Sequence, residues 1–126
     1  MRPVSEARSP RIARLSWGRI ELEDGRTFKD AVLYPGGAEP WDWTRTGTTH
    51  RRGIQPADLD PLIEAGCRAV VLSQGMEGRL EVARETIERL EREGLTYVAL
   101  PTREATERYN ELTETTLVGG LFHSTC

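Results

Sequence analysis

One glycine-containing segment has a spacing that could bind phosphate: Ser73-Gln74-Gly75-Met76-Glu77-Gly78 falls between a predicted strand and a predicted helix. A turn at such a place can present backbone N–H groups to an anion. Arg79, or Arg51 from an earlier loop, would supply the positive charge. The dinucleotide-binding pattern is incomplete, because Ser73 occupies its first glycine position and no acidic residue ends the next strand. We therefore prefer a plain strand-to-helix turn.

A second candidate is the sequence Trp41-Asp42-Trp43. In an extended segment both indoles would project to one side and Asp42 to the other, because side chains alternate. Two indoles can anchor a ligand or a partner surface. The simpler interpretation, which we prefer, is that Trp41 and Trp43 cover the edge of the core while Asp42 caps the threonine-rich loop.

Histidine and cysteine offer a third kind of chemistry. His123 and Cys126 stand three residues apart, and His50 or Cys67 could join them at a zinc ion, which accepts imidazole and thiolate ligands. No Cys-x-x-Cys pair supports such a site, so we expect no metal and no cofactor, and a terminal segment packed on a sheet. A cysteine nucleophile would need a histidine nearby in space, which the sequence does not show.

The N-terminal part predicts an antiparallel hairpin. Residues 1–9 have almost nothing to bury and predict a frayed terminus. Apolar residues recur at strand spacing from Ile12 to Leu22, and Asp24-Gly25 is a strong turn signal. The partner strand is expected from Thr27 to Tyr34. The segment from Pro35 to Gln55 is irregular and long for a loop, which is typical of a functional region.

The C-terminal part alternates between helix and strand patterns. The expected elements are a helix from about Asp60 to Gly66, a strand at 68–72, an amphipathic helix from Leu80 to Gly94 with Glu85–Arg89 and Glu88–Arg92 pairs, a strand at 95–100, a helix capped by Thr102, and a last short strand at 117–122. This alternation implies right-handed crossovers and a mostly parallel sheet. The predicted fold is three-layer α/β, with a mixed central sheet plus the N-terminal hairpin.

Four stretches together resemble the adipogenesis-associated MTH-domain family. They are Leu15-Ser16-Trp17-Gly18, Tyr34-Pro35-Gly36-Gly37 with Trp41-Asp42-Trp43, Gly53-Ile54-Gln55-Pro56-Ala57-Asp58, and Val118-Gly119-Gly120-Leu121-Phe122-His123-Ser124-Thr125-Cys126. The resemblance runs from about Pro10 to the last residue and implies a three-layer α/β fold with a mixed sheet. Relatives in animals are associated with fat-cell differentiation, and a distant branch assists assembly of mitochondrial complex I. It implies no defining reaction or cofactor.

Composition limits the partners that this chain could bind. A length of 126 residues suits one domain, which we place at 10–126. The net charge of -3 gives no broad positive field for nucleic acid. No stretch approaches the roughly 18 to 20 apolar residues that cross a membrane. Two cysteines without a secretion signal are expected to be reduced, which fits a cytoplasmic protein.

Two functions remain from the sequence. The first is a non-enzymatic interaction or assembly module that binds an unidentified protein partner through Trp41, Trp43 and their loop; a homodimer stays open. The alternative is a small-molecule, nucleotide or anion site, even that of an uncharacterised enzyme, between loop 36–53 and turn 73–78. Both would use the carboxyl ends of parallel strands, where open α/β sheets bind ligands.

Overall fold

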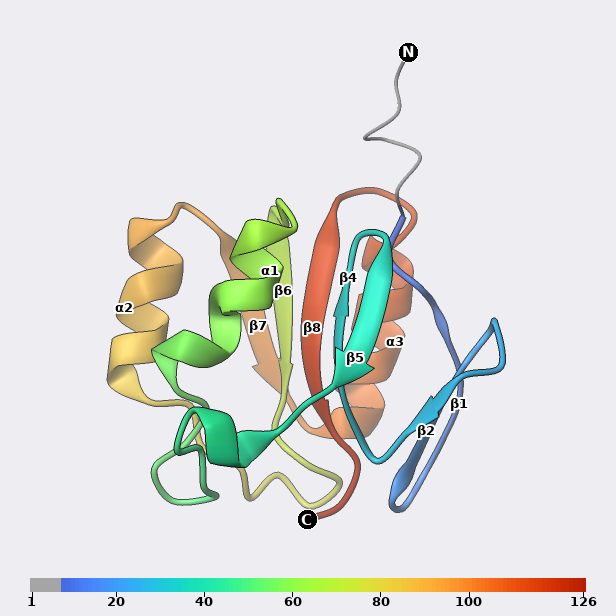
Figure 1. Cartoon of the computed structure of the whole chain (residues 1–126), viewed down its shortest axis with the longest axis horizontal. Coiled ribbons are helices and arrows are strands. Elements are labelled where there is room, and N and C mark those ends of the chain that lie inside the picture. The colour runs from blue at the N-terminus through green and yellow to red at the C-terminus, as the bar shows by residue number, and fades with distance from the viewer. Residues whose placement is uncertain (1–7) are drawn as a thin grey trace.

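The computed structural model describes residues 8–126, which form two sheets and three α-helices (Figure 1). The small sheet has the order β1-β2-β3, and the large one β5-β4-β8-β6-β7. The strands are β1 (Ile12–Ser16), β2 (Arg19–Leu22), β3 (Thr27–Phe28), β4 (Asp30–Tyr34), β5 (Gly37–Pro40), β6 (Ala69–Ser73), β7 (Thr96–Leu100) and β8 (Val118–His123). The helices are α1 (Asp60–Glu64), α2 (Arg84–Arg92) and α3 (Thr102–Leu112).

The large sheet is mixed, as predicted. Strand β6 pairs in parallel with β7 and β8, whereas β4 pairs antiparallel with β5 and β8. Every residue of β6 and β8 is buried, as is typical of strands covered on both faces. The expectation of a mostly parallel sheet was too strong, and the strand expected as a minor C-terminal addition lies at the centre.

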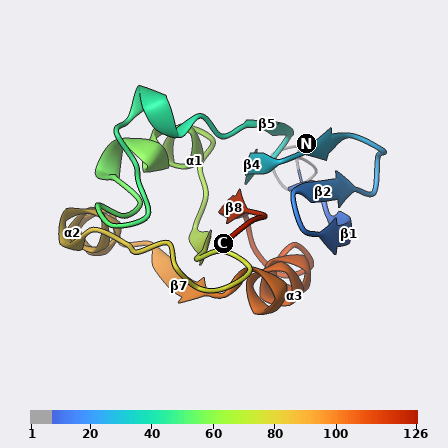
Figure 2. The same cartoon turned by 90° about the horizontal axis from the view of Figure 1, so that it is seen from below.

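The central sheet separates two hydrophobic cores. Seen from below, α1 and α2 cover one face of the sheet, while α3 and the small sheet cover the other (Figure 2). The core under α1 and α2 includes Trp41, Leu62 and Leu90, and the opposite core includes Tyr109 and Phe122. The three-layer prediction is therefore confirmed.

The N-terminal hairpin is more divided than its pattern predicts. The 12–22 segment forms two strands, because Gly18 takes a left-handed φ of 78° and leaves Trp17 57% exposed at the turn. The Asp24-Gly25 turn is confirmed between β2 and β3, and the expected partner strand splits into β3 and β4.

The predicted frayed terminus at 1–9 extends partly outside the described residues, which begin at Arg8. Within them, the Arg8 carbonyl accepts the Gly36 N–H at 3.1 Å. Buried Ser9 donates its hydroxyl to the Val118 carbonyl. The chain is thus tied to the domain before Pro10, earlier than we predicted.

The helices agree with the predicted positions better than with the predicted contacts. Helix α1 begins at Asp60 as expected, after the 3-10 helix η3 (Pro56–Leu59). Helix α2 begins at Arg84, later than Leu80, and Arg89 pairs with Asp60 at 2.6 Å instead of with Glu85. We find no Glu88–Arg92 ion pair within residues 8–126.

Two further expectations change in detail. Thr102 does not cap α3; its hydroxyl donates to the His123 carbonyl at 2.7 Å and so fixes the end of β8. The irregular 35–55 segment contains β5 and the 3-10 helix η2 (Trp43–Arg45). None of the helices in the described part of the chain is long and apolar enough to cross a membrane.

Candidate functional site

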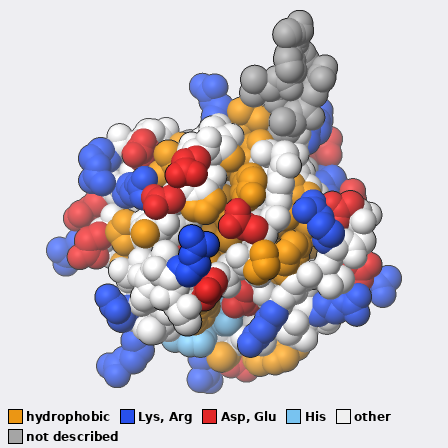
Figure 3. Space-filling model, in the orientation of Figure 1, with side chains coloured by type: hydrophobic (Ala, Val, Ile, Leu, Met, Phe, Trp, Pro, Cys, Tyr) orange, Lys and Arg blue, Asp and Glu red, His pale blue; other side chains and the backbone are white. Residues whose placement is uncertain are grey.

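A pocket of about 420 Å³ opens between β5, η2 and α1. Its lining residues are Val32, Glu39, Pro40, Trp41, Asp42, Arg45, Thr46, Ala57, Asp58, Asp60, Pro61 and Glu64. The pocket thus brings together the edge of the sheet and the segment that follows Gln55. On the corresponding face of the molecule, acidic and basic side chains border an apolar surface (Figure 3). Two of the residues predicted to bind a partner, Trp41 and Asp42, are part of this lining.

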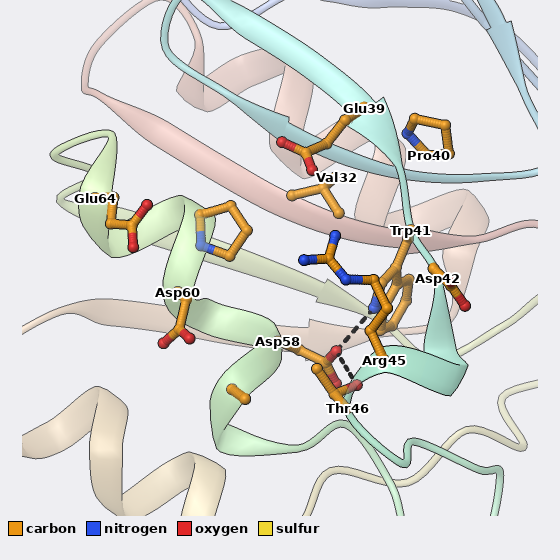
Figure 4. A pocket seen from close by; sticks show the side chains of 12 residues that line it. Val32, Glu39, Pro40, Trp41, Asp42, Arg45, Thr46, Asp58, Asp60 and Glu64 are labelled. Carbon is orange, nitrogen blue, oxygen red and sulfur yellow. Dashed lines mark hydrogen bonds between the residues drawn. The ribbon is translucent and has the colours of Figure 1, made fainter.

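A buried carboxylate holds the inner wall of the pocket. Asp58 is 4% exposed, and its oxygens accept the Trp41 indole N–H at 3.0 Å and the Thr46 hydroxyl at 2.6 Å (Figure 4). The same carboxylate accepts the Thr48 hydroxyl and, at 2.8 Å, the Gln55 N–H. Donors from three consecutive structural segments therefore converge on Asp58, as a buried charge requires.

The pocket combines one guanidinium with several carboxylates. In Figure 4 the Arg45 side chain points into the pocket, toward Val32 and Glu39, while Glu64 of α1 lies on the opposite side. Arg45 and Glu64 make no ion pair within the described residues. Asp60 is held by Arg89, and Asp58 by its hydrogen bonds. The charges left for a ligand are therefore mainly negative.

The two tryptophans behave differently. Trp41 is only 7% exposed and belongs to the core, while the half-buried Trp43 packs at its edge with ring centroids 5.6 Å apart. Asp42 is exposed and accepts the Thr44 N–H and hydroxyl at 2.9 Å and 2.6 Å, and these bonds lower its pKa. These contacts agree with the interpretation that the two indoles cover the edge of the core and Asp42 caps the loop. Trp43 does not line the pocket.

A cluster of imidazoles and a thiol lies on the far side of Trp43. The Trp43 ring is 4.6 Å from the ring of His123 and 5.0 Å from that of His50. The two Nε2 atoms of the histidines are 3.3 Å apart, and the Cys126 Sγ is 3.6 Å from Nε2 of His50. Sequence spacing placed His123 near Cys126, and the fold adds His50 rather than Cys67, which is buried in the core.

The predicted phosphate turn is occupied by the chain itself. The Met76 N–H donates to the Thr125 carbonyl at 2.6 Å, and the Arg79 N–H donates to the Cys126 carbonyl at 3.2 Å. Gln74 uses its backbone N–H on Leu100 and its side-chain amide on Leu80. Gly75 has φ of 94° and lies so near the Cys126 carbonyl that no Cβ would fit. These amides hold residues 125–126.

The two predicted arginines lie apart from the pocket. The exposed Arg79 side chain pairs with Glu77 at 3.2 Å, and Arg51 is exposed in the turn that follows His50. Neither lines the pocket beside Trp41. Arg45, Asp58 and Glu64 of the pocket lining were not among the residues predicted to form a site. Asp58 alone had a signal, because it stands at the third position of a 3-10 helix and completes a capping box with Gln55.

The fold has clear counterparts among solved structures. A conserved hypothetical protein from Pyrococcus horikoshii OT3 is 24% identical, with a TM-score of 0.78 over 92% of this chain and 99% of its own. An outer membrane protein from Bartonella henselae is 18% identical, with a TM-score of 0.75 over 95% and 98%. A Bordetella pertussis protein described as a Mth938-like domain is 16% identical, with a TM-score of 0.61 over 98% and 90%.

These likenesses show that the chain shares its α/β fold with the Mth938-like domain. Residues 12–123 match the family model described as "Protein of unknown function (DUF498/DUF598)", and the chain belongs to that family. The resemblance to MTH-domain proteins is thereby confirmed, and the family defines no specific activity.

Proposed function

We propose that this protein is an interaction module that binds a basic, extended segment of a protein partner in the pocket between β5 and α1. The observation that supports this most is the charge left in the pocket: its lining contains Glu39, Asp42 and Glu64 but a single arginine, Arg45. A lysine or arginine side chain entering the pocket would find carboxylates that internal ion pairs do not neutralise.

The position of β5 favours a peptide over a small molecule. Strand β5 is an edge of the five-stranded sheet, and it pairs on one side with β4. Apart from Pro40, which has no N–H, its outer backbone groups can pair with an added strand, a common mode of peptide recognition. Glu39 and Pro40 belong both to this edge and to the pocket lining. A bound strand along β5 would lead its side chains into the acidic pocket.

The inner wall of the pocket is already ordered. The Asp58 hydrogen bonds fix Trp41 and Thr46, so little side-chain freedom would be lost there on binding. Arg45 and Glu64 are exposed on the rim of the pocket. In this proposal Trp41 acts as a rigid wall, and Trp43 supports it from behind.

Titration with two short peptides tests the proposal. One alternates arginine with valine, and the other has glutamate in place of arginine. We expect the arginine peptide to shift the amide resonances of residues 37–46 and 56–64, and the glutamate peptide to leave them unchanged. Glu64→Lys replaces a carboxylate on the rim with a positive charge, so it should weaken binding of the arginine peptide by about threefold or more.

Glu107→Lys is the matched control, since Glu107 is exposed on α3, across the sheet from the pocket, and the charge change is the same. It should bind the arginine peptide as the unaltered protein does. Shifts that map elsewhere, equal loss of affinity in both variants, or no binding of either peptide would contradict the proposal.

The alternative of a nucleotide or anion site receives less support. Its amide donors at Met76 and Arg79 are already bonded to residues 125 and 126, and the acidic pocket would repel phosphate.

A further inference from the structure

We propose that His50, His123 and Cys126 form a binding site for a divalent transition-metal ion, with zinc as the best match. The ligand atoms are His50 Nε2, His123 Nε2 and Cys126 Sγ, which lie within 4.8 Å of one another. This inference is independent of the peptide pocket. It also reverses the preference that the sequence alone gave, which was for no metal.

Two of the three distances between the ligand atoms agree with a tetrahedral ion. Zinc lies about 2.0–2.1 Å from nitrogen and about 2.3 Å from sulfur, so tetrahedral angles put two nitrogens about 3.3 Å apart and nitrogen and sulfur about 3.6 Å apart. The nitrogens of His50 and His123 are 3.3 Å apart, and the sulfur of Cys126 is 3.6 Å from His50. His123 Nε2 and Cys126 Sγ lie within 4.8 Å of each other, so at most a small movement of the Cys126 side chain lets one ion reach all three.

A neighbouring carboxylate orients one of the imidazoles. His123 Nδ1 lies 3.1 Å from Asp30 Oδ1, and a carboxylate only accepts, so Nδ1 carries the proton of this hydrogen bond. Nε2 then keeps its lone pair and faces His50. A carboxylate behind a ligating histidine is the usual arrangement at metal centres, where it fixes the ring and raises its basicity. Asp30 is held in turn by the Ser124 N–H at 3.1 Å.

The backbone around the three ligands is fixed by hydrogen bonds. The Cys126 carbonyl accepts the Arg79 N–H, and the His50 carbonyl accepts the Glu81 N–H at 3.1 Å. His123 is the last residue of the central strand β8, 3% exposed, with its N–H donating to the Ser73 hydroxyl at 2.7 Å. Such a site needs little rearrangement to bind an ion.

The surroundings leave room for an external ligand. Trp43 packs on both imidazoles from one side, whereas His50 and Cys126 are only partly buried. Histidine surface is visible at the lower edge of the molecule (Figure 3). Three protein ligands leave the fourth tetrahedral position open to water or to an exogenous ligand, as in catalytic rather than structural zinc sites.

Metal titration of the tag-free, chelator-treated full chain tests the site. We expect one Zn²⁺ to bind per chain. Co²⁺ should give the intense visible bands of a tetrahedral ion together with a thiolate-to-cobalt charge-transfer band. Cys126→Ser should abolish the charge-transfer band, and His50→Gln should abolish stoichiometric binding. Asp30→Asn should weaken Zn²⁺ binding about 10–100-fold without removing the band at saturation, since Asp30 only positions a ligand.

Cys67→Ala is the matched control, because it removes the other thiol from a core position away from the cluster. It should keep both the stoichiometry and the cobalt spectrum. Circular dichroism shows which variants are folded, and the cobalt spectrum of the unaltered protein is informative by itself. Absence of saturable binding, a spectrum without thiolate charge transfer, or full binding in folded His50→Gln would overturn the inference. In each of these cases, the side chains from Asp30 to Cys126 would form a hydrogen-bonded chain and not a metal site.

Discussion

The indole N–H of Trp41 donates to Asp58 Oδ1 at 3.0 Å, and this bond joins the end of strand β5 to the turn that starts α1. Asp58 also receives the Thr46 and Thr48 hydroxyls, so a buried charge organises the whole loop.

Asp58→Asn should lower the free energy of unfolding by about 2–4 kcal/mol, because one acceptor oxygen becomes an NH₂ group that opposes donors. Urea denaturation measures the change. Asp42→Asn is the comparison: Asp42 accepts two hydrogen bonds as well, but it is exposed and should cost much less. Equal losses in the two variants would show that burial of Asp58 is not what matters.

The two thiols should differ sharply in reactivity. Cys67 is 5% exposed, and burial raises its pKa from about 9 to about 12, so almost no thiolate forms near neutral pH. Cys126 is partly exposed. Iodoacetamide should therefore modify Cys126 and leave Cys67 intact in the native, metal-free protein, and modify both in denaturant. Peptide mass mapping identifies the sites; rapid native labelling of Cys67 would contradict its burial.

The same pKa shift predicts a loss of stability in alkali. Below about pH 9 Cys67 is a thiol in both the folded and the unfolded chain, so it does not make the free energy of unfolding depend on pH. Above that pH the unfolded chain ionises while the folded one does not, so stability falls until the pH reaches about 12. Relative to Cys67→Ala, the unaltered protein should lose up to about 1.4 kcal/mol of unfolding free energy for each pH unit above pH 9. A constant difference would argue against the shift.

Gly75→Ala should be markedly more destabilising than Gly78→Ala. Both glycines have positive φ, 94° and 71°, so each alanine costs about 1–2 kcal/mol of backbone strain. A Cβ on Gly75 would also collide with the Cys126 carbonyl, whereas one on Gly78 meets nothing. The difference in lost stability between the two variants measures the contact that holds residues 125–126. Hydrogen exchange should show the Met76 and Arg79 amides losing protection in Gly75→Ala alone.

Local patterns predicted the elements with short-range causes. The apolar run Ala69-Val70-Val71-Leu72 became β6, and Gly66 and Gly94 follow the ends of α1 and α2 because each accepts a positive φ. The turn at Trp17-Gly18 was harder to predict than the one at Asp24-Gly25, since it interrupts a continuous apolar pattern. Whether such a segment breaks into two strands depends on which sheet each strand joins, and tertiary contacts determine that.

Long-range neighbours could not be predicted from the chain. His50 and His123 meet because β8 inserts between β4 and β6, and no spacing rule encodes a contact across 73 positions. The acidic pocket was missed for the same reason: Glu39 and Glu64 belong to different elements, and only packing of α1 beside β5 brings them together. Trp41 and Asp42 were found because unusual residue types marked them.

The central place of β8 also governs the order in which this domain can fold. Strands β5 and β4 pair with each other, as do β6 and β7, but only β8 joins these two ribbons. Until residues 118–123 are available, the ribbons have no shared ladder, and the partners of β8 lie far back in sequence. Such distant pairing slows the search for the native state. A chain that lacks β8 would expose open strand edges, which favour aggregation. A nascent polypeptide of this kind would therefore benefit from a chaperone until β8 is inserted.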